Sequence, residues 1–159
     1  MTKAASPIPR GFHTITPHLV IRGALEAMAF YQKAFGAEET LRNMGPNDML
    51  LHGEMKIGNA HFMIAEEWPQ MQYWVSPQQL QGTTTALSLF VDDADSWFNR
   101  AVEAGCQVSL PMMDAFWGDR YGKVRDPFGH EWEISTRMED LTPEEISANA
   151  AQFFAQMEE

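Results

Sequence analysis

Residues 116–136 read FWGDRYGKVRDPFGHEWEIST. The letters DPFG at residues 126–129 are typical of a turn, because aspartate, proline and glycine each favour turn conformations. On either side, Phe116–Arg125 and His130–Thr136 mix aromatic and β-branched residues with polar ones, which favours strands. The stretch therefore predicts two strands joined by a turn.

The two faces of the second of these strands differ in character. Strand side chains alternate between faces, so Trp132 and Ile134 point one way while Glu131 and Glu133 point the other. The first face suits packing against helices, and the mixed second face suits the lining of a cavity. We therefore expect Glu133 to face a cavity.

The same order of elements occurs earlier in the chain. An offset of 70 residues places TITPHLVI, residues 14–21, on TTALSLFV, residues 84–91, and residues 62–64 on residues 132–134. After each strand of the first pair, a helical stripe of apolar residues runs to a glycine, Gly36 or Gly105. The chain therefore reads as an α+β protein built from two βαβββ modules.

The repeat divides one expected domain, residues 1–159, into parts. Module one spans about residues 12–66 and module two about residues 84–137, with a connecting arm at residues 67–83 between them. After the first helix we expect strands only at residues 48–57 and 60–66. An arm of this length is interpreted as a functional lid or a dimer arm, and a disordered bridge is the alternative.

The tail is expected to form a helix over residues 142–157. Thr142, Pro143 and Glu145 follow one another as N-cap, first helical residue and capping-box partner. Ile146, Phe153 and Met157 then lie on one apolar stripe, which predicts docking on the domain or on a second subunit.

The charge balance excludes two classes of partner. Eleven Lys and Arg residues stand against 22 Asp and Glu residues, for a net charge of −11, which repels phosphate backbones and anionic lipid heads. We expect neither nucleic acid nor membrane as a partner, since no window approaches the roughly 18 apolar residues of a membrane span. The lone Cys106 cannot form an intrachain disulfide and is interpreted as an unreactive thiol. Because the amino-terminal residues also lack an apolar run, we expect a cytoplasmic protein.

Residues 116–136 and the segment ITPHLVIRGALEAMAFYQKAFGAEE, residues 15–39, resemble the vicinal oxygen chelate superfamily. This superfamily takes in glyoxalases, bleomycin-resistance proteins and dioxygenases, and the match is closest to its PhnB-like subgroup. The resemblance covers roughly residues 12–145 and reports fold better than chemistry. It implies two modules that form a curved sheet around a cavity, in a homodimer.

In metal-dependent relatives, the resemblance implies one ligand from the first strand and one from the last strand of each module. Carried onto this chain, those positions are Thr16, Met63, Ala86 and Glu133. Only Glu133 can ligate a metal, so we expect no cofactor. The alternative is a divalent metal at His18, His61 and Glu133, although with Thr16 opposite Met63 the two histidines would lie about 13 Å apart along their strands.

A cavity without a metal suits a binding protein. We interpret the chain as a metal-independent small-molecule-binding protein that sequesters a cationic or aromatic compound and holds it through Glu133. His18 and Tyr121 would add polar contacts, and Trp117 would add a ring for stacking. Two alternatives stay open: a metal-dependent lyase, isomerase or dioxygenase with Glu133 as general base, and a structural or regulatory dimer without a ligand.

Overall fold

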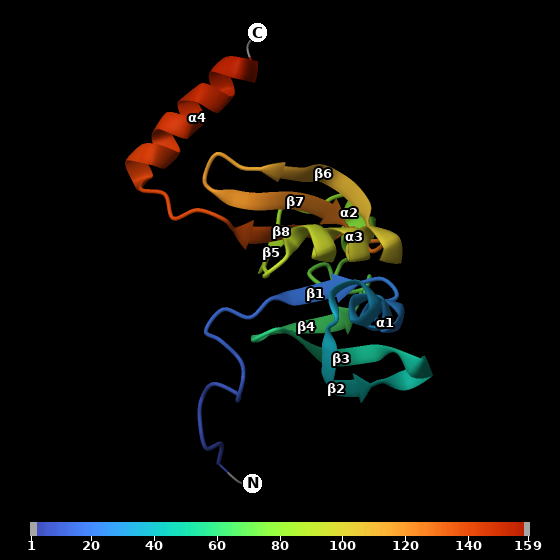
Figure 1. The fold of residues 1–159 in the computed structure, drawn as a ribbon. Coiled ribbons are helices and arrows are strands. Elements are labelled where there is room, and N and C mark those ends of the chain that lie inside the picture. Colours follow the sequence, from blue (N-terminus) through green and yellow to red (C-terminus); the bar gives the residue numbers. More distant parts are fainter. Residues whose placement is uncertain (1–2, 158–159) are drawn as a thin grey trace. The chain divides into compact units, whose positions relative to one another are not determined.

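The computed structural model describes residues 3–157. The chain forms two compact units, of which the first ends at Thr83 and the second begins at Thr84. Each unit contains a four-stranded mixed sheet with a helix against one face (Figure 1). The elements of the first unit are β1 (His18–Ile21), α1 (Ala24–Phe35), β2 (Glu38–Met44), the 3-10 helix η1 (Pro46–Asp48), β3 (Leu50–Ile57), β4 (Ala60–Glu66) and α2 (Pro77–Leu80). Those of the second are β5 (Ala86–Phe90), α3 (Ala94–Ala104), β6 (Gln107–Asp114), β7 (Asp119–Arg125), β8 (Glu131–Arg137) and α4 (Pro143–Met157).

In the first unit, α1 packs on a sheet with the strand order β1-β4-β3-β2. β1 and β4 run parallel, and the other neighbouring pairs run antiparallel. The apolar stripe of α1 buries Met28, Tyr31 and Phe35 completely, as the helical spacing predicts. Tyr31 meets Phe62 of β4 edge to face, with ring centroids 6.0 Å apart. Gly36, at φ 62, ends the helix in the left-handed conformation that glycine adopts without strain.

The second unit repeats this arrangement with α3 on a sheet of order β5-β8-β7-β6. Asp126 explains why the DPFG sequence turns, because its Oδ1 accepts hydrogen bonds at 2.9 Å from the backbone N–H groups of Phe128 and His130. Its Oδ2 accepts a third, at 2.9 Å, from the indole of Trp132, which is 1% exposed. The turn is therefore tied directly to the core.

The strand register confirms the internal repeat. The parallel pair β1 and β4 places His18 opposite Met63, and the parallel pair β5 and β8 places Ser88 opposite Glu133. Each residue of the second pair lies 70 positions after its counterpart, and α1 and α3 begin with the same offset. The α+β fold of two βαβββ modules with a C-terminal helix is thus confirmed, and a curved sheet shared around a cavity stays a prediction.

Several strands begin one to three residues or more later than expected, and the structure gives a reason for β1 and β7. β1 starts at His18 and not at residue 14, because Pro17 has no N–H for a sheet and Ile15 is 88% exposed. β7 starts at Asp119 and not at residue 116, because the chain turns just before it, with Gly118 N donating to Ala115 O at 2.9 Å.

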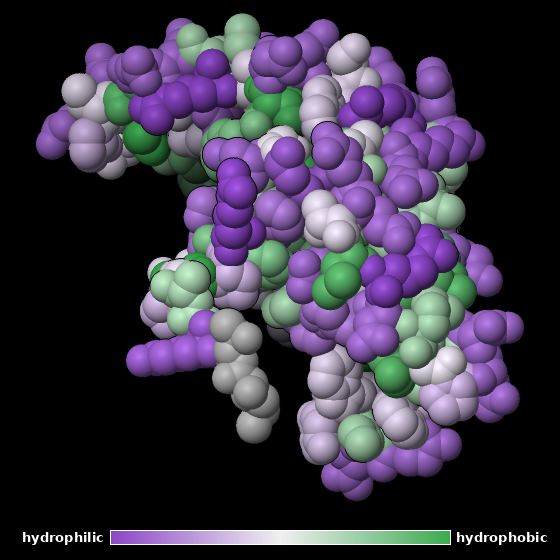
Figure 2. All heavy atoms as spheres, turned by 90° about the horizontal axis from the view of Figure 1, so that it is seen from below, coloured by the Kyte–Doolittle hydropathy of each residue, from purple (hydrophilic) through white to green (hydrophobic). Residues whose placement is uncertain are grey.

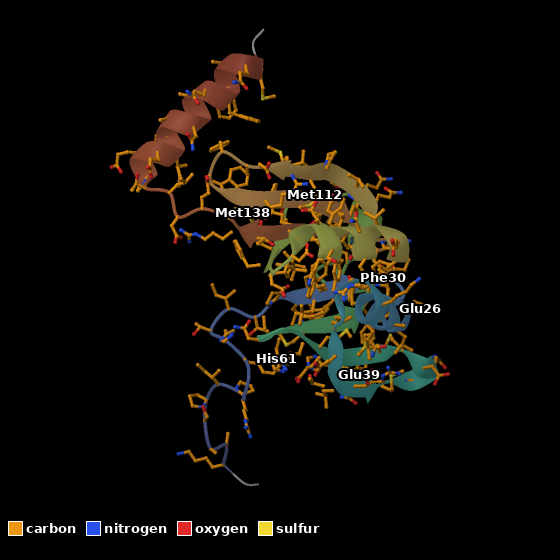
Figure 3. The ribbon with its side chains drawn as sticks, viewed as in Figure 1. Glu26, Phe30, Glu39, His61, Met112 and Met138 are labelled. Carbon is orange, nitrogen blue, oxygen red and sulfur yellow. The ribbon has the colours of Figure 1, made fainter. Side chains whose placement is uncertain are left out.

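The strand β2 was not predicted at all. Its seven residues are all exposed, so it lacks the alternation of apolar and polar side chains that reveals a half-buried strand. Figure 3 marks Glu39 on this strand. β2 pairs with β3 on one side only and forms an edge of its sheet.

The tail helix α4 is confirmed together with its capping box. Thr142 N donates to Glu145 Oε2 at 2.8 Å, and Glu145 N donates to Thr142 Oγ1 at 3.3 Å. Phe153 and Phe154 lie against Phe116, with ring centroids 5.6 and 6.2 Å apart. The helix follows β8 through a short link (Figure 1), and docking of its stripe on a second subunit stays a prediction.

Hydrophilic side chains cover most of the face seen in Figure 2, with hydrophobic ones in small groups between them. Among residues 3–157, the structure contains no helix with the length and apolar character needed to cross a membrane.

Candidate functional site

Each sheet has a second face, which its helix does not cover and which we term the open face. In the first unit the open face carries His18, His52, Glu54 and Met63. In the second unit the equivalent positions are Ser88, Tyr121, Lys123 and Glu133. Residues on β3 and β7 correspond with an offset of 69 instead of 70, because the connection from Arg125 to Glu131 is one residue longer than that from Lys56 to His61.

On the open face of the second unit, the Glu133 cluster consists of Ser88, Tyr121, Lys123 and Glu133. Ser88 Oγ donates a hydrogen bond to Glu133 Oε2, and Lys123 Nζ lies 3.9 Å from Glu133 Oε1. The Tyr121 hydroxyl also bonds to Glu133, and its pKa is raised to about 12, first by burial and then by this bond and the charge of Glu133. The phenol therefore stays protonated at neutral pH and donates. Glu133 is fixed by these contacts while 27% of its side chain remains exposed.

Trp117 stands beside this cluster. Its ring meets that of Tyr121 edge to face, with centroids 5.2 Å apart, and its Nε1–H donates to Asp119 Oδ2 at 3.1 Å. Both contacts fix the indole orientation while leaving Trp117 half-buried. The structure therefore brings together three of the residues predicted for a ligand site, namely Trp117, Tyr121 and Glu133.

A second acidic residue, Glu131, lies one pleat away on β8 and is already paired. It is buried, and its Oε1 accepts from Arg125 Nε at 2.6 Å while its Oε2 accepts from Ser109 Oγ at 2.9 Å. Glu133 is therefore the more accessible of the two carboxylates on this strand.

On the open face of the first unit, two imidazoles and an indole meet. The ring of His18 lies 5.0 Å from that of Trp74 and 6.1 Å from that of His52, edge to face in both cases. His52 Nε2 is 3.1 Å from Glu54 Oε1. Partial burial, with a smaller contribution from the charge of His52, lowers the pKa of His18. A neutral imidazole is therefore favoured at this position.

In module one, the register of β1 against β4 differs from the one that the resemblance implies, in which Thr16 lies opposite Met63. Thr16 precedes β1, and its hydroxyl donates to the backbone oxygen of His13 at 2.9 Å. The residue opposite Met63 is His18. The imidazole, and not the Thr16 hydroxyl, is thus the polar neighbour of Met63 on the open face.

In module two the register is shifted in the same way. Ala86 begins β5 and lies opposite Glu131, one pleat from the pair formed by Ser88 and Glu133. The hydroxyl of Ser88 is therefore the first-strand group that reaches Glu133.

This register also corrects the expected distance between His18 and His61. Because His18 lies opposite Met63, His61 is offset from it by one pleat, about 6.6 Å along the strands, and not by two. The His61 ring nevertheless has other partners. Its Nδ1 lies 2.7 Å from Gly11 O, and the ring stacks on Phe12 at 4.9 Å, at the start of β4 (Figure 3).

The four positions that the resemblance implies as metal ligands do not fit a metal in this chain. Ala86 offers only a methyl group and Met63 only a thioether, and the Thr16 hydroxyl is bonded to the backbone. Glu133 is therefore the only strong donor for a divalent ion among these four positions. Within residues 3–157, no group of three or more His, Cys, Asp or Glu side chains could hold a metal.

Sequence reasoning missed several members of these faces. His52, Glu54 and Lys123 were not singled out, although His52 lies 69 residues before Tyr121 and Glu54 lies 69 residues before Lys123. Applying the repeat to β3 and β7, with its offset corrected for the longer turn, would have paired them. Cys106 is buried, and burial together with the charge of Asp126 raises its pKa to about 12, which keeps it an unreactive thiol.

Comparison with known proteins assigns the family. The model of the Glyoxalase/Bleomycin resistance protein/Dioxygenase superfamily matches residues 12–134. An uncharacterized protein of Mycobacterium tuberculosis (strain ATCC 25618 / H37Rv), Rv0887c, is 40% identical over 136 residues, or 84% of this chain and 80% of that protein.

Two solved structures extend the comparison. TioX from Micromonospora sp. ML1 shares 25% identity and a TM-score of 0.61, over 82% of this chain and 100% of that one. The PhnB protein of Bacillus cereus, at 17% identity and a TM-score of 0.59 over 78% of this chain and 99% of its own, shows the shared fold. These matches confirm the resemblance seen in the sequence, and the chain is a member of the glyoxalase/bleomycin resistance protein/dioxygenase superfamily.

Proposed function

We propose that this protein binds a small molecule on the open face of its second unit, with Glu133 as the polar anchor and without a metal. The Glu133 cluster carries the proposal. Glu133 is the one residue at the four family ligand positions that can ligate, and Ser88, Tyr121 and Lys123 hold its carboxylate in place. A carboxylate oriented in advance binds a ligand N–H or O–H group with less loss of side-chain entropy.

The surroundings favour a cationic or aromatic ligand. Trp117 and Tyr121 offer two ring systems beside the carboxylate, and the net charge of −11 attracts cations over a longer range. The description of the matching family includes bleomycin resistance proteins, and the resemblance to them implies binding of a drug without covalent chemistry. Sequestration of such a compound is therefore the role we propose.

Tryptophan fluorescence tests this proposal. Purified protein is titrated with bleomycin and with a panel of planar cationic aromatic compounds, as wild type and as Glu133→Gln. We expect saturable quenching by at least one compound, and an affinity about 10- to 100-fold lower in the variant, since a charged hydrogen bond contributes about 1.5–3 kcal/mol.

Glu139→Gln is the matched control, because it removes the same charge from an exposed residue of the same unit. It should leave the affinity unchanged. Equal losses in the two variants would show that only net charge matters, and saturation by no compound would contradict sequestration of this ligand class.

A further inference from the structure

The arm loop, residues 68–75, has both of its ends held by a single buried carboxylate. Glu67 is 8% exposed and accepts hydrogen bonds from Ser76 Oγ at 2.6 Å and from Ser76 N at 3.3 Å. Arg22 Nε donates to the other oxygen of Glu67. Burial opposes the charged form of Glu67, but the bonds from Ser76 and Arg22 outweigh it and lower its pKa. The neck of the loop is thus closed by a charged, hydrogen-bonded pair.

Backbone hydrogen bonds also fix the inside of the arm loop. Trp68 N donates to Trp74 O at 2.8 Å, Met71 N to Trp68 O at 2.8 Å, and Trp74 N to Met71 O at 2.9 Å. A loop tied in this way keeps its shape without a ligand. Its apolar side chains are therefore held in position before anything binds.

These side chains enclose an apolar slot on the first unit. Trp68, Met71 and Trp74 form its outer wall, and Leu50 and Ala65, which are 1% and 3% exposed, form its floor. The slot has a volume of about 220 Å³. Trp68 is 40% and Met71 36% exposed, so the slot opens to solvent.

The carboxylate of Glu66, at the edge of the slot, already accepts hydrogen bonds on both of its oxygens. Glu66 lines the slot, but its two oxygens accept from Gly23 N at 2.9 Å and Ala24 N at 2.7 Å, at the start of α1. The positive end of the helix offsets the charge of this carboxylate. A cationic group would have to compete with those backbone amides, so the slot favours an uncharged ligand.

We propose that this slot binds a neutral, single aromatic ring of a small molecule. An apolar cavity of about 150 Å³ accommodates benzene, so a slot of this size has room for one substituted ring. Indole and thioether walls are suited to edge-to-face and sulfur contacts with such a ring. The slot lies within the first unit and does not involve Glu133, so the inference stands apart from the function proposed above.

Binding of p-cresol, which is neutral at pH 7, tests the slot. The readout is the shift of the Trp68 and Trp74 indole N–H signals in ¹H–¹⁵N NMR spectra. We expect saturable shifts of both signals in the wild type and, read from the Trp68 signal alone, an affinity about tenfold lower in Trp74→Ala, which removes an aromatic wall. Ala65→Leu fills the slot from its floor and should abolish the shifts of the Trp68 and Trp74 signals.

Tyr73→Ala is the matched control, because Tyr73 belongs to the same loop but is 76% exposed and does not line the slot. It should bind p-cresol like the wild type. Equal weakening in Tyr73→Ala and Trp74→Ala, or shifts that persist in a folded Ala65→Leu variant, would overturn the inference. Shifts that follow protein concentration instead of p-cresol would assign the slot to a second copy of the chain and overturn it as well.

Discussion

At the scale of single residues, Tyr121 and Glu133 form a coupled pair. The hydroxyl of Tyr121 bonds to Glu133, and burial together with this bond raises its pKa to about 12. Glu133→Gln removes the negative charge that favours the protonated phenol, so the pKa should move down toward the ordinary value of about 10. The difference in absorbance at the phenolate band between each protein and its Tyr121→Phe form reports this titration. An unchanged midpoint in a folded Glu133→Gln variant would contradict the coupling.

His18 makes the stability of the protein depend on pH, because its pKa is lowered where that of Tyr121 is raised. Its pKa is lowered in the folded state, first by partial burial and then by the charge of His52, so the unfolded chain binds the proton more readily. Stability from this residue is fully present above the ordinary histidine pKa of about 6.5 and decreases as the pH falls below it. The free energy of unfolding of the wild type should therefore fall relative to that of His18→Gln between about pH 7 and pH 5. Urea unfolding at several pH values measures the difference, and a constant difference would disprove this assignment.

At the scale of elements, the neck of the arm loop depends on Glu67. At pH 7, Glu67→Gln should lower the free energy of unfolding by about 1–3 kcal/mol, because it weakens charged hydrogen bonds of a buried group. Because the pKa of Glu67 is lowered in the folded state, the loss should shrink as the pH falls through that lowered value. Chemical denaturation measures both effects. Glu39→Gln, which breaks the exposed Glu39–Arg42 pair, is the control and should change stability little; equal losses would contradict the special role of the neck.

Two equivalent glycines let each helix approach its sheet closely. A Cβ on Gly122 would lie 2.5 Å from Met112 Sδ and 2.9 Å from the Phe98 ring, whereas a Cβ on Gly53 would first meet Met28 Sδ at 3.0 Å. A methionine can move aside more easily than a buried ring. Gly122→Ala should therefore destabilise the protein by about 1–3 kcal/mol, and Gly53→Ala by less. Thermal unfolding of both variants checks the order, and a larger loss in Gly53→Ala would contradict it.

Elements were predictable from the sequence where one face is buried. α1 and β4 occupy the expected residues because their apolar side chains recur with the helical or strand period. β2 was missed because both of its faces are exposed and its residues are mostly polar. The periodicity of a strand reports burial, so an exposed edge strand leaves no such signal.

At the scale of the whole molecule, most of the predicted fold followed from the internal repeat, but the repeat did not determine the register between neighbouring strands. The offset of 70 aligned the first and last strands of the two modules, and alternation along the last strand placed Glu133 on an open face. Alternation fixes which face a side chain takes, but it does not fix how far one strand slides along its neighbour. For this reason Thr16 and Ala86 were expected where His18 and Ser88 lie, and Lys123 became part of the candidate site only once β7 was paired with β8.

The central claim is that Glu133 anchors a small molecule without a metal. Elemental analysis of protein purified without chelator, followed by ligand titration with and without EDTA, tests it most directly. The account predicts no near-stoichiometric metal, and a ligand affinity that EDTA leaves unchanged and Glu133→Gln weakens. Near-stoichiometric nickel, zinc, iron or manganese that is lost together with ligand binding in Glu133→Gln would contradict it.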